Sequence, residues 1–154
     1  MKSLTQYIQE KLVIKKRNNI FDYKYFPETK RELKDIIKQR IESKGNEVDL
    51  NDIDTSKITD MSHLFQNPDF NGHISQWDVS NVTNMSYMFY RCKSFSQDIS
   101  NWDVSKVISM WGMFYGCKDF NQDISSWDVS KVKDMKYMFD YCPIEEKYRP
   151  KFKD

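Results

Sequence analysis

The sequence predicts an α/β repeat protein in which short coils stack, with strands aligned on one face and short helices or 3₁₀ turns on the other. A unit of 25 residues recurs along residues 48–142, and self-similarity at such a period is typical of stacked arrays. Within each unit, the apolar spacing changes from alternation to steps of three and four, which indicates a strand followed by a short helix.

The unit is clearest in its third copy. Its apolar residues are Ile99, Trp102, Val104, Val107, Met110, Met113, Phe114, Cys117 and Phe120. The same residue types stand 25 residues earlier, from Ile74 to Phe95, and 25 residues later, from Ile124 to Cys142. We expect the strand around Trp102-Asp103-Val104, with the Trp and Val side chains in the core and Asp outside, because side chains alternate along a strand.

The repeats divide the chain into three parts. Residues 1–47 are expected to form an N-terminal cap, residues 48–142 four repeats (48–69, 70–94, 95–119 and 120–142), and residues 143–154 a C-terminal cap or tail. The first repeat has Ile53 where the others have Trp, and Pro68 where they have Cys. Terminal repeats are commonly atypical because they meet a cap. Tyr148 and Phe152 are expected to cover the far end.

The N-terminal cap contains patterns for two helices and one extended stretch. Leu4, Ile8 and Leu12 form an apolar stripe that predicts a helix over about residues 3–15. Residues 20–26 are rich in aromatics and predict a short extended stretch that ends at Pro27. A capping box from Thr29 to Glu32 predicts the start of a second helix, and Lys44-Gly45 predicts its end.

The apolar spacing Ile-x-x-Trp-x-Val-x-x-Val matches the frame of leucine-rich repeats. The longer pattern Asp-Ile-Ser-x-Trp-Asp-Val-Ser-x-Val-x-x-Met-x-x-Met-Phe-x-x-Cys resembles the BspA-like leucine-rich repeats of bacterial surface proteins and mycoplasma lipoproteins. The resemblance covers residues 48–142 and implies a short right-handed leucine-rich-repeat-like solenoid. The better-known members of the BspA-like family are secreted adhesins that bind host proteins. This chain carries four units and shows no apolar export segment, and short versions of this kind resemble phage or intracellular binding modules.

A column of aspartates recurs once per unit on the expected outer side of the strands: Asp54, Asp78, Asp103 and Asp128. Stacked strands would bring these carboxylates to a spacing of ~4.8 Å. The column predicts either an acidic stripe for a partner or carboxylates that accept local hydrogen bonds from serine and backbone groups. The second interpretation is favoured because unpaired like charges directly opposite each other are destabilising.

The third unit breaks the pattern with Ile108, Trp111 and Tyr115, where the other units mostly carry polar residues. Their spacing would place the three on one face of the predicted short helix. An apolar group on a face expected to meet solvent indicates an interface, and Trp and Tyr are frequent anchors of interfaces. The alternative is that the ring of Trp111 folds over the small Gly112, where other units have Tyr87 and Tyr137.

No catalytic motif and no cofactor or metal site is expected. The sequence lacks a phosphate-binding loop, a dinucleotide fingerprint and a nucleophile elbow. Cys92, Cys117 and Cys142 lack the paired spacing of zinc ligands and are expected to be small, reduced core residues, like the Met and Phe columns. We therefore expect a protein that is not an enzyme.

Charge separates the cap from the repeats, although the chain as a whole has a net charge of +1. Residues 1–47 hold 12 Lys and Arg against 7 Asp and Glu, whereas residues 48–142 hold 8 against 13. A nucleic-acid partner is the least favoured one, because acidic residues interleave the basic ones of the cap. These basic residues are Lys15, Lys16, Arg17, Lys30, Arg31, Lys34, Lys38 and Lys44.

The sequence favours a module that binds a protein partner through the strand face or the Ile108, Trp111 and Tyr115 patch. The alternative is a structural or self-associating protein, such as a phage or assembly component, that forms homo-oligomers. With neither a signal peptide nor a membrane span in the sequence, we expect a cytoplasmic protein without membrane contact, in the host cytoplasm if it is phage-encoded.

Overall fold

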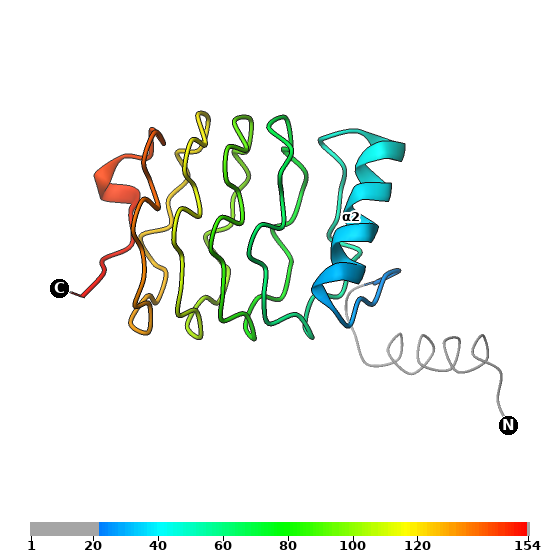
Figure 1. Cartoon of the computed structure of the whole chain (residues 1–154), viewed down its shortest axis with the longest axis horizontal. Coiled ribbons are helices and arrows are strands. Elements are labelled where there is room, and N and C mark those ends of the chain that lie inside the picture. The colour runs from blue at the N-terminus through cyan, green and yellow to red at the C-terminus, as the bar shows by residue number, and fades with distance from the viewer. Residues whose placement is uncertain (1–21, 154) are drawn as a thin grey trace, which may run out of the picture.

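The computed structural model describes residues 22–153, and it shows a row of irregular coils lying side by side with a helix at one end (Figure 1). Helix α2 spans Lys30–Lys44, and a short 3₁₀ helix, η1, spans Glu146–Tyr148 near the other end. The helix predicted over residues 3–15 lies outside the described residues. No helix between residues 22 and 153 is long and apolar enough to cross a bilayer.

Helix α2 begins and ends where the sequence predicts. The backbone N–H of Glu32 donates to the Thr29 side chain, and the Glu32 carboxylate accepts from the backbone N–H of Thr29, so the capping box is complete. Gly45 follows the last turn with a φ of 86°, a backbone conformation that glycine adopts without a Cβ clash. The helix buries Leu33 and Ile37 against the core and leaves Lys38 and Lys44 exposed, whereas Lys30 Nζ donates to Asp60 and Ser62 of the first coil.

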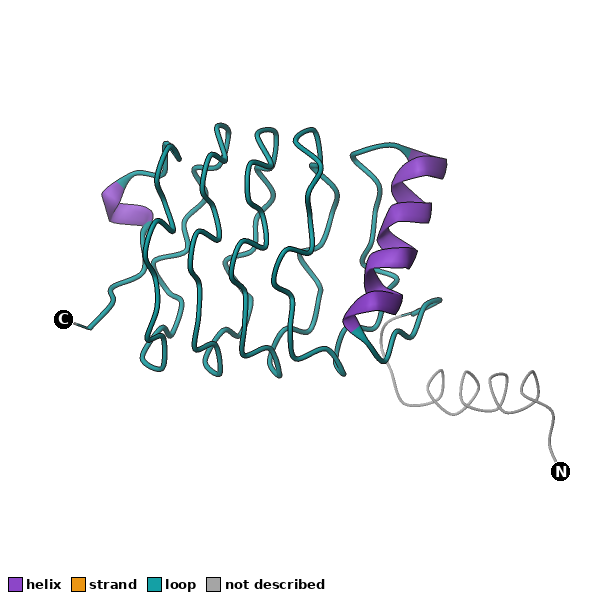
Figure 2. Ribbon diagram, in the orientation of Figure 1, coloured by secondary structure: helices purple, strands orange, loops and turns teal. Residues whose placement is uncertain are grey.

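The predicted fold class, a leucine-rich-repeat-like solenoid with a parallel sheet and helices on opposite faces, is wrong. Between residues 22 and 153 the structure has no β-strand and no sheet, and the repeats consist of turns and loops (Figure 2). Parallel pairing is confined to five isolated bridges. Four of them join equivalent residues of successive coils: Asp49 with His73, Asp60 with Asn84, Asn84 with Ser109, and Ser109 with Asp134. The Trp-Asp-Val segments expected as strands lie elsewhere, in the loops.

Backbone hydrogen bonding explains why no strand forms. Tyr87 N–H donates to Trp111 O in the following coil, as in a parallel ladder. The carbonyl that would complete this ladder is turned aside, because Tyr87 O accepts from Tyr90 N–H of its own coil. Met85 O and Phe89 O do the same, accepting from the N–H groups three residues on. Half of the ladder is thus replaced by local turns.

Left-handed residues also rule out the short helix that was predicted for the Val-to-Cys half of each unit. In this half, Tyr87 and Arg91 of the second coil have φ values of 56° and 58°. The same left-handed backbone conformation occurs at Gly112 and Gly116 of the third coil and at Tyr137 and Tyr141 of the fourth. A right-handed helix cannot continue through such a residue, so the chain makes successive turns instead.

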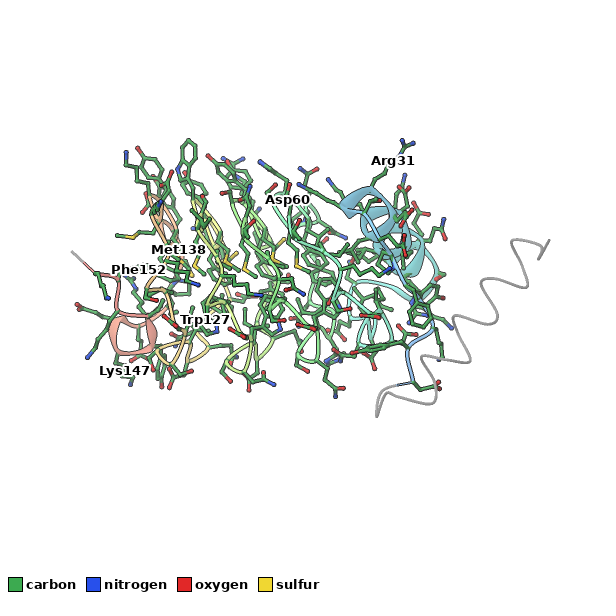
Figure 3. All side chains as sticks on the ribbon, turned by 90° about the horizontal axis from the view of Figure 1, so that it is seen from below. Arg31, Asp60, Trp127, Met138, Lys147 and Phe152 are labelled. Atoms are coloured by element: carbon green, nitrogen blue, oxygen red, sulfur yellow. The ribbon has the colours of Figure 1, made fainter. Side chains whose placement is uncertain are left out.

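The core runs through the whole row of coils. Each repeat contributes buried residues at equivalent positions, and their rings stack from coil to coil, as Phe65 on Phe89 (5.3 Å) and Phe89 on Phe114 (5.5 Å). Figure 3 places Trp127 and Met138 within the last coil, whereas Arg31 of α2 extends outward. The indole N–H groups donate to backbone carbonyls of the preceding coil, from Trp77 to Leu50, Trp102 to Ile74 and Trp127 to Ile99.

Both ends of the row are partly covered. At the first coil, Tyr25 forms a parallel bridge with Ile53, and α2 packs its apolar side on the same end. At the last coil, Tyr148 O accepts from the Ile124 N–H, and the rings of Tyr148 and Phe152 pack partly buried against the core. In the other half of the last coil, Met135, Tyr137 and Tyr141 remain exposed, whereas Met138 is buried.

Candidate binding surface

A row of aromatic rings, the ring ladder, runs along one side of the coils. It consists of His63, Tyr87, Trp111 and Tyr137, with centroid separations of 4.8, 5.4 and 6.4 Å. Stacking of successive coils places these rings in order, one from each repeat. Trp111 is 38% exposed and Tyr137 is 56% exposed. The ladder is therefore part of the surface, although each ring is supported by its neighbours.

Trp111 enters the ladder from a neighbouring position in its repeat. His63, Tyr87 and Tyr137 share one left-handed position, and in the third coil that position is Gly112. A Cβ at Gly112 would lie 2.7 Å from Cε1 of Tyr87, so a side chain there would collide with that ring. The ring of Trp111 stands between Tyr87 and Tyr137 instead. The glycine and the tryptophan together keep the ladder continuous.

A second row of tyrosines lies beside the ladder. Tyr90 stacks on Tyr115 at 5.2 Å, and Tyr115 meets the edge of Tyr141 at 5.3 Å. Tyr87 joins the two rows through a T-shaped contact with Tyr90 at 5.4 Å. Cations lie over the outer rings of this row: the Arg91 guanidinium is 5.2 Å from the Tyr90 centroid, and Lys118 Nζ is 5.4 Å from that of Tyr141.

The structure does not place the three predicted patch residues on one helical face. Ile108 is 45% exposed, and its backbone takes part in the bonds between coils, with the N–H donating to Thr83 O and the carbonyl accepting from Lys133 N–H. Trp111 belongs to the ring ladder, and Tyr115 belongs to the second row. The patch is therefore spread over two rows of rings rather than over one short helix.

The aspartates of the predicted column accept local hydrogen bonds. In Asp103, Oδ1 accepts from the Ser105 N–H at 3.0 Å and from Ser105 Oγ at 2.6 Å. Asp54, Asp78 and Asp128 accept from the serine two residues on in the same way. The Ser105 and Ser130 hydrogen bonds lower the pKa values of the Asp103 and Asp128 carboxyls. Asp54 is only 5% exposed, whereas the other three face solvent.

The cysteines lie in the core and carry no disulfide. Cys92 and Cys117 are buried, and their thiols donate to the backbone carbonyls of Phe65 and Phe89. Burial raises the pKa of the Cys92 thiol to about 12 and also raises the pKa of Cys117. Over residues 22–153, no group of three His, Cys, Asp or Glu side chains converges as metal ligands would.

Sequence reasoning missed most of the ring surface. Tyr87, Tyr90, Tyr137 and Tyr141 belong to it, together with His63. A signal for part of it was present, because His63, Tyr87 and Tyr137 occupy equivalent positions of successive repeats. The contact between Tyr115 and Tyr141 joins positions that are not equivalent, so the repeat spacing gave no sign of it.

Two grooves lie near this surface. One, of about 780 Å³, separates α2 from the first coil and is lined by both charge signs, including Lys34, Asp35 and Glu42, above Ile37 and Phe65. The other, of about 750 Å³, follows the second row of tyrosines across the coils. We call the latter the tyrosine groove. It opens directly beside the ring ladder, because Tyr90 and Tyr115 line it.

One of the comparisons with known proteins gives a match, which is to a protein family. Residues 32–149 match the family described as mycoplasma proteins of unknown function, DUF285. Neither the curated proteins nor the solved structures provide a match. The matched range includes most of α2, all the coils and η1. The chain belongs to the DUF285 family of mycoplasma proteins.

Proposed function

We propose that this chain is a non-enzymatic module that binds a protein partner through the ring ladder, with Trp111 at the centre of the contact. The observation that carries the proposal is the exposure of large apolar side chains on one side of the coils. Of the five large hydrophobic residues exposed between residues 22 and 153, Trp111 and Tyr137 stand in the ladder itself. The remaining three are Ile108, Met135 and Tyr141.

The chemistry of the ladder suits a protein contact. Trp and Tyr offer large contact areas and few rotatable bonds, and they dominate the binding energy of many interfaces. Neighbouring rings hold Trp111 at 5.4 and 6.4 Å, so little conformational freedom remains to be lost on binding. The resemblance to BspA-like repeats, whose better-known members bind host proteins, supports the same function.

The test is capture of a partner from a lysate of the source organism by the wild-type chain and by Trp111→Ser. Ser86 occupies the equivalent position of the second coil, so serine is compatible with the backbone there. Lys106→Ser serves as a control on another part of the third repeat. The proposal predicts a protein that the wild type and the control capture and that Trp111→Ser loses, with all three chains folded, as shown by a cooperative thermal transition.

Light scattering separates this function from self-association, the alternative that the exposed rings also permit. A monomer at working concentration supports binding to a different protein. A defined oligomer that dissociates in Trp111→Ser would contradict the proposal, because the ladder would then be occupied by a second copy of the chain. Equal capture of the same partner by the wild type and Trp111→Ser would likewise contradict it.

A further inference from the structure

The tyrosine groove arises from a second break in the repeat pattern. Arg91, Gly116 and Tyr141 occupy one left-handed position in successive coils. The third coil has no side chain at this position, so a notch remains between Arg91 and Tyr141. At Gly112 the preceding residue, Trp111, places its ring between Tyr87 and Tyr137, and at Gly116 the preceding residue, Tyr115, contacts the rings of Tyr90 and Tyr141. A Cβ there would lie 3.3 Å from Cγ of Arg91.

The walls of the groove carry hydrogen-bond donors and positive charge. Its lining residues are Gln66, Pro68, Tyr90, Arg91, Lys93, Tyr115, Gly116, Lys118 and Tyr141. Three of these are cations and none is acidic, within a repeat region that holds 8 Lys and Arg against 13 Asp and Glu. The local charge is therefore opposite to that of the array around it, which favours an anionic occupant.

The shape of the groove favours an elongated occupant. Its lining comes from all four coils, from Gln66 of the first to Tyr141 of the last. Ring centroids along it are 5.2 and 5.3 Å apart, so three steps between coils cover roughly 15 Å. An extended polypeptide rises ~3.3 Å per residue, so about five residues would follow the groove from end to end.

The arrangement of the rings distinguishes between two anionic polymers. Single-stranded nucleic acids bind aromatic side chains by stacking bases on ring faces. Tyr90 and Tyr115 already stack on one another, and Arg91 lies over Tyr90. Their faces are therefore occupied, whereas the cationic groups of Arg91, Lys93 and Lys118 suit carboxylates. In the last coil, the position equivalent to Tyr90 and Tyr115 is Asp140. This acidic residue ends the positively charged part of the row.

We propose that the tyrosine groove binds an extended, acidic segment of a partner protein, whose carboxylates pair with Arg91, Lys93 and Lys118. This rests on the proposed function, since it names the chemistry of the partner and a second contact beside the ladder. A carboxylate seated in the notch at Gly116 lies between the Arg91 and Lys118 side chains, and the partner backbone follows the tyrosine row.

Fluorescence anisotropy at low ionic strength tests the proposal with a labelled peptide in which glutamate alternates with leucine and serine. Its glutamine counterpart and a single-stranded oligothymidylate serve as comparison probes. The groove variant is Arg91→Gln, Lys93→Gln and Lys118→Gln. The matched control removes three cations of the third and fourth repeats that do not line the groove, Lys106→Gln, Lys131→Gln and Lys133→Gln. Gly116→Asn fills the notch with a residue that tolerates the left-handed conformation and leaves every charge in place.

The expected result is that the glutamate peptide binds and the glutamine peptide does not, with an affinity that salt weakens. The groove variant and Gly116→Asn should each lower the affinity for the glutamate peptide by about tenfold or more. The control should lower it by less than about twofold, because charge-assisted hydrogen bonds are short-ranged. Tighter binding of the oligothymidylate, equal loss in the control, or no binding of the glutamate peptide would overturn the proposal. Trp111→Ser should leave peptide affinity unchanged, so failure of the ladder and failure of the groove are measured separately.

Discussion

Trp111 occupies the place in the ring ladder that Gly112 leaves without a side chain. Tyr87 and Tyr137 fill this place from the position equivalent to Gly112, whereas Trp111 reaches it from the preceding residue. Gly112 has a φ of 58° and lies under the Tyr87 ring. The two residues therefore depend on each other, because a side chain at position 112 would displace the rings on which Trp111 packs.

Gly112→Ala is expected to destabilise the protein more than Gly116→Ala. Both glycines are left-handed, and an alanine in that conformation costs roughly 1–2 kcal/mol. At Gly112 the new methyl group would also meet the Tyr87 ring at 2.7 Å, whereas at Gly116 it would meet the flexible Arg91 side chain at 3.3 Å. Urea unfolding of both variants measures the difference. Equal losses of stability would show that the Tyr87 ring moves away from the new methyl group without lowering the free energy of unfolding.

The core could be predicted from the sequence, but the backbone path could not. The recurring apolar residues mark the core correctly, and Trp77, Trp102 and Trp127 are buried as their spacing indicates. The same spacing is compatible with a strand and with successive turns, because both return a side chain to the core at similar intervals. The choice is made by backbone groups such as Tyr87 O, which bonds within its coil, and side-chain patterns carry no such information.

The candidate surface was predictable only in part. Ile108 and Trp111 are exposed, and they stood out because they break the repeat. Tyr137 and Tyr141 conform to the architecture of the coils, so they did not stand out. Their exposure follows from their place in the last described coil, where no further coil covers them. The Asp-x-Ser pairs were correctly read as a local arrangement, because the hydrogen bond spans only two residues.

Trp102→Phe is expected to lower the free energy of unfolding by about 0.5–1.5 kcal/mol, because the carbonyl of Ile74, which also accepts from the Trp77 N–H, would lose one of its two donors. The indole Nε1 of Trp102 donates to that carbonyl at 3.2 Å. Trp111→Phe is the control, since Trp111 is 38% exposed and should tolerate the change with a much smaller loss. Chemical denaturation compares the two. A loss as large in the control would mean that Trp111 acts as a core residue.

Hydrogen exchange should distinguish the last coil from the coil before it. The N–H groups of Met110, Gly112, Phe114 and Gly116 donate to carbonyls of the following coil. In the part of the chain that the structure describes, the equivalent N–H groups of Met135, Tyr137, Phe139 and Tyr141 have no such acceptor. NMR should therefore find slow exchange in the first set and fast exchange in the second. Equal protection would show that another segment covers the last coil.

Stability should decrease in acid as the aspartate–serine hydrogen bonds are lost. Hydrogen bonds from Ser105 and Ser125 lower the pKa values of Asp103 and Asp123 in the folded state. Because the folded pKa values are depressed, this contribution is fully present above the unfolded value of about 3.9 and is lost as the pH falls through the lower folded values. Melting temperatures measured from neutral pH down to about pH 2 test this.

The variant Ser105→Ala, combined with Ser125→Ala, controls for other acidic groups. It removes the side-chain hydrogen bonds, which are the largest cause of both shifts. Its melting temperature should be lower than that of the wild type at neutral pH, and the two should converge in strong acid. A constant difference at every pH would show that the serines act through packing and not through these carboxylates.

Hydroxyl-radical footprinting of the chain, alone and with the partner captured by the wild type, tests the ring ladder as a binding surface most directly. In the free chain, the exposed rings of Trp111, Tyr137 and Tyr141 should be labelled readily, whereas the buried rings of Trp102 and Trp127 should not. Our account predicts that the partner reduces the labelling of Trp111 most strongly. Labelling of the tyrosines on the same side of the coils should fall as well. Protection confined to the turns of Asp78, Asp103 and Asp128, with Trp111 labelled as in the free chain, would contradict it.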